Sequence, residues 1–252
     1  MKAYTGFALV YDEYMDNIPY EEWSGYLMEL MKENGITEGM QVADLGCGTG
    51  TVTMILDDAG YDCVGIDNAP DMLTIAADKM YESEKQIVYS LQDMRDFEFP
   101  YKMDGMISIC DSMNYITTVS DLISVFQCVG DNLKDGGVFI FDLKTIHFFR
   151  DVLADNTYAE NRDESAFVWD NIYHEDNRNN EYDLAVFIMN EEGTFDRYEE
   201  SHYQHGFSLD EVHCAAATAG LKVKAVYDAF THDEPNEESE RYYFVLEKEE
   251  SN

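Results

Sequence analysis

The chain has 252 residues and carries 52 acidic against 16 basic side chains, a formal net charge of −36. Such a negative field repels phosphate backbones, which argues against nucleic acid as a partner. A cationic or amine-bearing small molecule suits the field better, although solubility alone also accounts for the charge. With 45% hydrophobic residues the chain can bury a large core, which excludes disorder, and its length suits one α/β domain with an insertion.

The five cysteines are scattered, and no two form a closely spaced pair. This pattern fits a reducing compartment and argues against a disulfide framework or a zinc site, so we expect no bound metal. We find neither a secretory signal nor an apolar stretch near the ~18 residues of a membrane span. We therefore expect a cytoplasmic protein without a membrane partner, either a monomer or a homodimer.

The first predicted helix begins after Pro19 in an aromatic and acidic segment. Proline suits the first turn of a helix, and the apolar side chains that follow recur at helical spacing. Gly35 is placed to end this helix as a C-terminal cap.

The segment Val42–Gly50 predicts a strand, a tight turn and the start of a helix, as in the first βα unit of a doubly wound sheet. It contains Asp44 and the alternating glycines Gly46, Gly48 and Gly50. Glycine has no Cβ, so a ligand can lie against bare backbone here. A dinucleotide fingerprint needs glycine at the sixth position of the turn, where Thr51 stands, so a nicotinamide enzyme is disfavoured.

Asp67 ends the second predicted strand, Tyr61–Asp67. It lies about twenty residues beyond the glycines, where an acidic side chain can accept both hydroxyl groups of a ribose. Pro70 suits the first turn of the next helix, for which Asn68 is the expected cap.

Two further strands are predicted at Ile87–Gln92 and Met106–Cys110. Open α/β sheets bind ligands just beyond the carboxyl ends of their strands. Asp111 and Tyr115, which follow the second of these strands, are therefore candidates for the substrate side of a site. Asn114 is either a third candidate or a turn residue.

A helix capped by Ser120 and a fifth strand, Val138–Asp142, continue the alternating pattern. Residues 166–207 then change to three strands of period two, which we expect to form an antiparallel lid over the site. The main α/β domain is accordingly predicted over 1–165 and 208–252.

Alternation along the last lid strand puts His202 and Gln204 on one face and His205 on the other. Histidines three residues apart suit a metal site on a helix rather than on a strand, so no metal is expected here either. A capping box at Ser208–Glu211 then starts another helix, and two more strands follow it.

Several of these segments together resemble the class I S-adenosylmethionine-dependent methyltransferases. Asp44–Gly50 matches their D-x-G-x-G-x-G loop, the residues from Asp67 resemble D-x-S-x-x-M-L, and those from Asp111 resemble D-S-x-N-Y-L. The stretch Phe7–Asp12 is similar to the F-A-x-V-Y-D segment of small-molecule members, including amino-sugar N-methyltransferases. The resemblance implies a Rossmann-like, seven-stranded, mostly parallel sheet with an inserted antiparallel β lid.

The resemblance also implies which residues hold S-adenosyl-L-methionine. In the family an N-terminal segment folds over the cofactor, and an aromatic face suits its sulfonium charge. An acid binds the ribose, a methionine packs under the adenine, and an Asp with the residue after it meets the adenine edge. The corresponding residues here are Tyr11, Tyr20, Trp23, Asp44, Gly46, Gly48, Asp67, Asn68, Met72, Asp93, Met94 and Cys110.

We therefore expect transfer of a methyl group to a small-molecule nitrogen or oxygen acceptor by in-line displacement, which demands alignment and exclusion of water. A general base is needed only if the acceptor arrives protonated. His202 is the first candidate for this role, followed by Tyr115 and Asp111. Two alternatives stay open: a methyltransferase acting on a protein or RNA target, and a non-catalytic protein that binds the cofactor.

Overall fold

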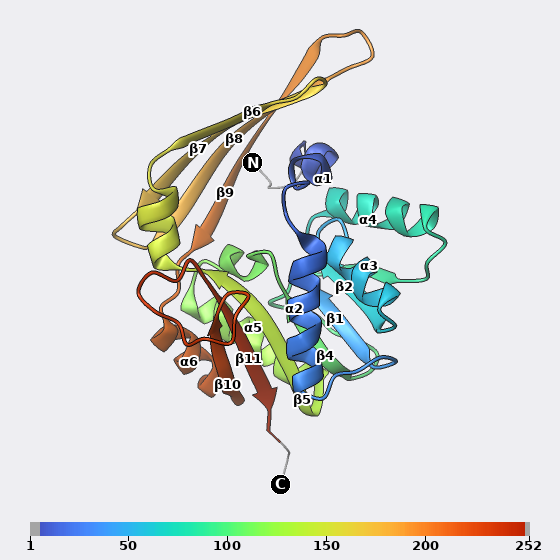
Figure 1. The fold of residues 1–252 in the computed structure, drawn as a ribbon, viewed down its shortest axis with the longest axis vertical. Helices are drawn as coiled ribbons and strands as arrows, with labels where there is room; N and C mark the ends of the chain where they lie inside the picture. The colour runs from blue at the N-terminus through green and yellow to red at the C-terminus, as the bar shows by residue number, and fades with distance from the viewer. Residues whose placement is uncertain (1–5, 250–252) are drawn as a thin grey trace.

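The structure is a computed structural model that describes residues 6–249. These residues form a seven-stranded sheet with helices on both faces, and a four-stranded sheet that stands away from it (Figure 1). The strand order of the large sheet is β10-β11-β5-β4-β1-β2-β3. Its strands are β1 Gln41–Leu45, β2 Asp62–Asp67, β3 Val88–Leu91, β4 Met103–Ser108, β5 Leu133–Lys144, β10 Leu221–Asp228 and β11 Arg241–Lys248.

The large sheet is mostly parallel, and only β11 runs against both of its neighbours. The chain winds outward from β1 through β2 and β3 on one side, then returns to β4 and β5 on the other. This reversal of strand order beside β1 creates the place where open α/β sheets bind ligands. The predicted Rossmann-like architecture is confirmed.

Helices cover both faces of the sheet, because each carries an apolar stripe that must be buried. One face packs on α5 and α6, and the other on α2 and α3. The described helices are η1 Phe7–Val10, α1 Tyr11–Tyr14, α2 Tyr20–Glu33, α3 Thr51–Asp58, α4 Pro70–Glu82, η2 Ser112–Tyr115, α5 Val119–Asn132, η3 Phe148–Leu153 and α6 Leu209–Thr218. None of them is long and apolar enough to cross a membrane.

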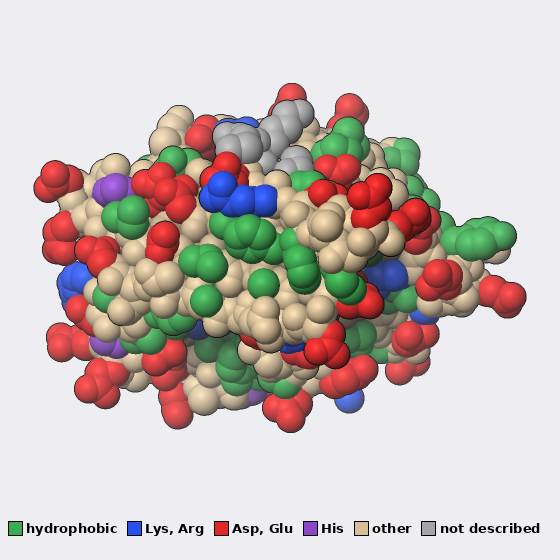
Figure 2. Space-filling model, turned by 90° about the horizontal axis from the view of Figure 1, so that it is seen from above, with side chains coloured by type: hydrophobic (Ala, Val, Ile, Leu, Met, Phe, Trp, Pro, Cys, Tyr) green, Lys and Arg blue, Asp and Glu red, His purple; other side chains and the backbone are tan. Residues whose placement is uncertain are grey.

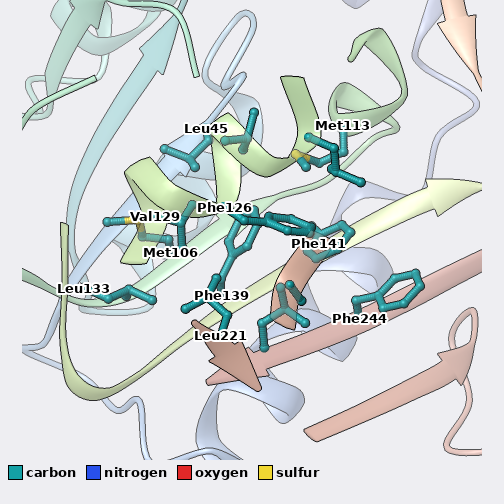
Figure 3. Close-up of a cluster of buried hydrophobic side chains, with 14 of the residues drawn as sticks. Leu45, Met106, Met113, Phe126, Val129, Leu133, Phe139, Phe141, Leu221 and Phe244 are labelled. Atoms are coloured by element: carbon teal, nitrogen blue, oxygen red, sulfur yellow. The ribbon is translucent and has the colours of Figure 1, made fainter. Parts of the chain in front are cut away.

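The core under α5 is dominated by stacked phenylalanines from β5 and β11 (Figure 3). The ring of Phe141 lies 4.9 Å from that of Phe139 and 5.0 Å from that of Phe244, and Phe126 of α5 packs against both β5 rings. All four side chains are fully buried. Truncating one of them to alanine would cost about 3–5 kcal/mol, so this cluster fixes β5 and β11 beside β4.

Two expected helix caps are wrong. Helix α5 begins one residue before Ser120 and is capped by Thr118, whose hydroxyl accepts from the amide of Asp121 at 3.1 Å. Thr118 has the extended backbone that a capping residue needs, whereas Ser120 is already helical. Helix α4 begins at Pro70, so Ala69 and not Asn68 occupies the capping position. Ala69 has no side-chain oxygen, and the helix therefore lacks a side-chain cap.

The small antiparallel sheet contains the three predicted lid strands and a fourth strand before them. Its order is β6-β7-β8-β9, with bounds β6 Thr157–Asn161, β7 Ser165–His174, β8 Asn179–Met189 and β9 Phe195–His205. The lid therefore starts earlier than residue 166. Strand β6 has no fully buried side chain, so its sequence lacks the apolar alternation by which the other three are recognised.

The N-terminal segment, which we define as residues 7–16 with η1 and α1, lies between the lid and the large sheet (Figure 1). On the lid side, the ring of Tyr14 packs edge-on against Phe167 at 4.8 Å, and Arg162 pairs with Asp16 at 2.9 Å. On the other side, Asp12 accepts hydrogen bonds from the glycine-rich loop and from α4. The segment thus joins the two sheets over the ends of β1 and β2.

Candidate active site

A cavity of about 230 Å³ lies at the carboxyl ends of β1, β2 and β4, beneath the N-terminal segment. Most of the side chains predicted to form the site line it. Those that do are Tyr11, Tyr20, Asp44, Gly46, Gly48, Asp67, Asn68, Met72, Met94, Cys110 and Tyr115. The cavity is also lined by residues that were not singled out, namely Cys47, Thr49, Thr51, Val52, Gln92, Ile109 and Ser112.

The glycine-rich loop brings bare backbone to the cavity. Gly46 and Gly48 have positive φ angles of 75° and 54°, in the left-handed region that favours glycine. A Cβ on Gly46 would come within 2.8 Å of the Ser112 side chain, so the loop and η2 could not approach as they do. A Cβ on Gly48 would meet no described atom within 4 Å, because this residue faces the open cavity.

Two carboxylates, the partly buried Asp67 and the buried Asp44, support the structure around the glycine-rich loop. Asp67 accepts from the amide of Gly48 at 2.9 Å and from that of Ala69 at 2.8 Å, and burial raises its pKa. Asp44 accepts from the Thr53 hydroxyl at 2.6 Å, and burial raises its pKa to about 7. Each carboxylate oxygen can accept more than one hydrogen bond, so Asp67 keeps capacity for a ligand's hydroxyl groups.

Two tyrosines form the aromatic wall of the cavity, while the predicted tryptophan lies elsewhere. Tyr11 and Tyr20 both line the cavity, and burial raises the pKa of each phenol. Trp23 does not line it. One helical turn further along α2, its ring packs against Phe230 at 4.9 Å and under the Arg241 guanidinium at 5.1 Å.

Asp93 is also outside the cavity lining, although both of its sequence neighbours, Gln92 and Met94, contribute to it. The two carboxylate oxygens of Asp93 accept from Arg95 at 2.9 Å and 2.6 Å. These hydrogen bonds lower the pKa of Asp93. The carboxylate is therefore directed at a neighbouring cation two residues away.

A polar cluster, made of Asp111, Asp142, Lys144, Gln204 and Arg241, lies beside the cavity. Asp142 accepts from the amides of Cys110 and Asp111 at 3.1 Å and 2.8 Å. Arg241 of β11 pairs with both carboxylates. Gln204 and Lys144 bind Asp111 at 2.7 Å and 3.0 Å.

The cluster explains why Asp111 is a poor base. Burial by itself would raise the pKa of Asp111, but Lys144 and Arg241 outweigh it and lower the pKa. The residue is also held in a left-handed conformation, φ 57°, next to Cys110 at 59°. Two successive non-glycine residues in this region are strained, and the Asp142 carboxylate stabilises the turn through its two amide contacts.

A chain of three side chains leads from the cavity into the lid. The Tyr115 hydroxyl, at the cavity wall, is 3.1 Å from Nδ1 of His202, and Nε2 of His202 is 3.1 Å from Oε2 of Glu200. Oε1 of Glu200 accepts from the amide of Phe7 at 2.9 Å. His202 thus does not line the cavity itself and reaches it through Tyr115.

Sequence reasoning missed Glu200, Asp142, Lys144 and Arg241. The signal for Glu200 was present, since period two places it on the same strand face as His202 and Gln204. For Arg241 the sequence offers only a charged residue at the start of an apolar strand. Its partner Asp111 is 130 residues away in the chain, so no local pattern connects them.

Comparison with known proteins agrees with this geometry. A family model described as "Methyltransferase domain" matches residues 42–137. The chain is 32% identical over 246 residues, 97% of each chain, to the Bacillus subtilis protein named "Putative methyltransferase YqeM". Its fold resembles an S-adenosylmethionine-dependent methyltransferase from Clostridium acetobutylicum, with a TM-score of 0.86 at 25% identity over 99% of this chain and 100% of that one.

The fold is also shared with the sugar N-methyltransferase KedS8 from Streptoalloteichus, at a TM-score of 0.79 and 18% identity over 96% and 93% of the two chains. The match to methyltransferases agrees with the spacing of Gly46, Gly48 and Gly50, which disfavours a nicotinamide enzyme. The chain has a Rossmann-like sheet with a glycine-rich loop where the strand order reverses. It also matches a methyltransferase relative over 97% of both chains. The chain belongs to the class I S-adenosylmethionine-dependent methyltransferases.

Proposed function

We propose that this enzyme transfers the methyl group to a nitrogen or oxygen atom of a small molecule. The observation that carries the proposal is the enclosure of the site. The N-terminal segment contributes Tyr11 to the cavity wall. Lid strand β9 hydrogen-bonds Tyr115 of η2 through His202, and Asp111 just before η2 through Gln204. A folded macromolecule would have to displace both elements, whereas a small acceptor needs only a gap beside Tyr115.

The lining residues fit S-adenosylmethionine by their chemistry. We assign Asp67 to the ribose hydroxyls, Met72 and Met94 to the adenine faces, and Tyr11 with Tyr20 to the sulfonium, because an aromatic face attracts a cation. The carboxylate of Asp93 is hydrogen-bonded to Arg95, so we do not assign Asp93 to the adenine edge. Gln92 and the backbone at Met94 are better placed.

S-adenosylmethionine supplies a methyl group bound to a positively charged sulfonium sulfur. This charge already activates the methyl carbon for attack by the lone pair of the acceptor. The protein's part is therefore to align the acceptor and to exclude water. The strained Cys110–Asp111 turn, held by Asp142, fixes the wall of the cavity next to Tyr115. Rigid support of this kind keeps the acceptor in line at contact distance.

Nitrogen is the favoured acceptor atom. The formal charge of −36 attracts cations, which includes most aliphatic amines at neutral pH. The fold relative KedS8 is named a sugar N-methyltransferase, which supports a small amine as the first class to test.

The test is mass spectrometry of a metabolite extract incubated with the enzyme and methyl-labelled S-adenosylmethionine. We expect label in a small product of one added methyl group, absent with Gly48→Leu, whose side chain would fill the cavity. Label found only in protein or RNA would establish the macromolecular alternative. Binding of S-adenosylhomocysteine without any labelled product would support a non-catalytic binding protein.

A further inference from the structure

We propose that Tyr115, His202 and Glu200 form a proton relay that deprotonates an ammonium acceptor, so that the enzyme takes its substrate as a protonated amine. The inference rests on the proposed function and adds to it the protonation state of the acceptor and the route of its proton. Tyr115 would touch the acceptor, while His202 and Glu200 act through Tyr115 as positioning residues.

The tautomer of His202 follows from the hydrogen bonds that its two ring nitrogens make to Glu200 and Tyr115. A carboxylate only accepts hydrogen bonds, so Nε2 of His202 carries the proton that it donates to Glu200 at 3.1 Å. A neutral imidazole with a proton on Nε2 presents a lone pair on Nδ1. This lone pair accepts from the Tyr115 hydroxyl at 3.1 Å. The phenolic proton of Tyr115 is thereby directed into the lid, while Tyr115 itself lines the cavity.

Glu200 is built into the lid at an energetic cost. Its side chain is fully buried and that of His202 is 4% exposed, and a buried carboxylate is expensive unless it is paired and hydrogen-bonded. The adjacent Glu199 points the opposite way, is 54% exposed and pairs with Arg197 on the surface. The fold therefore buries the Glu200 carboxyl group on one face of β9, next to the His202 ring.

The second oxygen of Glu200 ties the relay to the segment over the cavity. Oε1 accepts from the backbone amide of Phe7 at 2.9 Å, four residues before the cavity-lining Tyr11. The ring of Phe7 packs edge-on against that of Tyr11 at 5.6 Å. The carboxylate that orients His202 is thus held by the same segment that closes over the cofactor site.

The step balances without an added reactant. The acceptor N–H bond breaks as its proton moves to Oη of Tyr115, while the phenolic proton of Tyr115 moves to Nδ1 of His202. Both electron pairs stay with the atoms that lose the protons, so nothing is oxidised or reduced. His202 becomes an imidazolium, which the Glu200 carboxylate stabilises, and the acceptor nitrogen gains a free lone pair.

Four other titratable residues near Tyr115 are less suited to this role, namely Asp111, Tyr11, Tyr20 and Cys110. Asp111 is paired with two cations that lower its pKa, which makes it a weak proton acceptor. Burial raises the pKa of Tyr11, Tyr20 and Cys110, which therefore keep their own protons. His202 differs from these groups because one of its ring nitrogens is hydrogen-bonded to Tyr115 at the cavity wall.

The first experiment needs no acceptor. Nuclear magnetic resonance of the protein with isotope-labelled histidine, in complex with S-adenosylhomocysteine, reports which ring nitrogen of His202 is protonated. We expect the proton on Nε2, with its resonance far downfield because it bonds a carboxylate. Glu200→Gln should move this resonance upfield, and Glu199→Gln should leave it unchanged. A proton on Nδ1 in the wild type, or no response to Glu200→Gln, would overturn the relay.

The second experiment measures kcat and KM with the amine that the metabolite screen returns. Tyr115→Phe and Glu200→Gln should each lower kcat by about 10²- to 10⁴-fold, with KM changed less than about threefold. The double variant should be no slower than the slower single variant, because groups that act as a unit are not additive. Independent, multiplying losses, or an unchanged kcat in Glu200→Gln, would contradict the proposal.

The proposed function and the proton relay can be refuted separately. If the screen returns no small amine, the acceptor class is wrong, yet the resonance experiment still decides whether the hydrogen-bonded chain exists. If an amine is methylated and Glu200→Gln binds S-adenosylhomocysteine and turns over like Glu199→Gln, the proposed function stands and the relay is refuted.

Discussion

At the scale of single residues, the site depends on partly or fully buried carboxylates that hold the backbone and side chains around the cavity. Asp67 shows this best, since it holds the amides of Gly48 and Ala69 and lies at the cavity where we place the ribose. Asp111, Asp142 and Glu200 likewise serve as anchors for backbone or neighbouring side chains. Their charges organise the cavity wall before any ligand arrives.

Replacing Asp67 tests its assignment to the ribose. Asp67→Ala removes two charge-assisted hydrogen bonds and should cost roughly 2–4 kcal/mol of affinity for S-adenosylhomocysteine, measured by calorimetry. Asp78→Ala, an exposed position on α4, is the control and should bind like the wild type. A loss of less than about threefold in Asp67→Ala would show that another group binds the ribose.

Asp44 gives a prediction for pH. Its folded pKa of about 7 lies above the ordinary value of about 3.9, so the folded state holds the proton more tightly than the unfolded state. The free energy of unfolding should therefore fall as the pH rises from about 4 to about 7, by about 4 kcal/mol from this group. Asp44→Asn has no titrating carboxyl group at this position. Its thermal midpoint should therefore fall less than that of the wild type as the pH rises over this range.

Thermal midpoints of the two ligand-free proteins, followed across the same buffers, measure this difference. Subtracting one curve from the other isolates Asp44 from carboxylates such as Asp67 and Asp142, whose pKa values burial also raises. Parallel curves would mean that Asp44 is ionised in the folded protein throughout.

At the scale of elements, the N-terminal segment is the part that must move for a ligand to enter. Asp12 of α1 accepts from the Thr49 hydroxyl at 2.6 Å and from Lys79 at 2.8 Å, which fastens the segment to the glycine-rich loop and to α4. The side chains of the Lys79–Asp12 pair are 27% and 40% exposed, and such ion pairs contribute about 0.2–1 kcal/mol.

Asp12→Ala should therefore speed the release of S-adenosylhomocysteine by about two- to fivefold, as followed by stopped-flow fluorescence, with little change in thermal midpoint. Glu21→Ala, at an exposed position of α2, provides the matched loss of a carboxylate and should leave release unchanged. Equal release rates in the wild type and Asp12→Ala would mean that this contact does not hold the segment closed.

The sequence anticipated the elements whose patterns are local. Period-two alternation located three lid strands, and the spacing of Gly46 and Gly48 located the turn at the end of β1. It failed for strand β6, where no side chain is fully buried, and for the cap of α5, where Thr118 and Ser120 are equally good candidates. Burial decides the first case and backbone conformation the second, and both are properties of the assembled fold.

The site divides in the same way. Residues on the glycine-rich loop and at the ends of β1 and β2 line the cavity, because their positions follow from the fold class. Four other residues predicted to contact ligands lie outside the cavity lining and contact other side chains, namely Trp23, Asp93, Asp111 and His202. Partners such as Arg241 come from distant strands, so which charge neutralises which cannot be seen along the chain.

At the scale of the whole molecule, the net charge of −36 dominates. Acidic side chains surround the face shown in Figure 2, most of them near its rim, with few basic ones between them. Like charges at this density repel one another in the compact state and lower its stability. The charge therefore favours cationic ligands at the expense of folding free energy.

Salt should relieve this repulsion. Raising NaCl from about 0.01 M to about 0.1 M shortens the screening length from about 30 Å to about 10 Å. A gain of only about 1 kcal/mol would raise the thermal midpoint of a domain of this size by about 2–4 °C, within reach of calorimetry. A midpoint that falls with salt would show that attractive ion pairs outweigh the net repulsion.

The central claim is that the cavity at the ends of β1, β2 and β4 is a site for S-adenosylmethionine. Calorimetric titration with S-adenosylhomocysteine, and separately with NAD, tests it most directly. We expect one S-adenosylhomocysteine bound per chain with a dissociation constant on the order of micromolar, no heat from NAD, and loss of binding in Gly48→Leu. Tight binding of NAD, with S-adenosylhomocysteine giving no heat, would contradict the account.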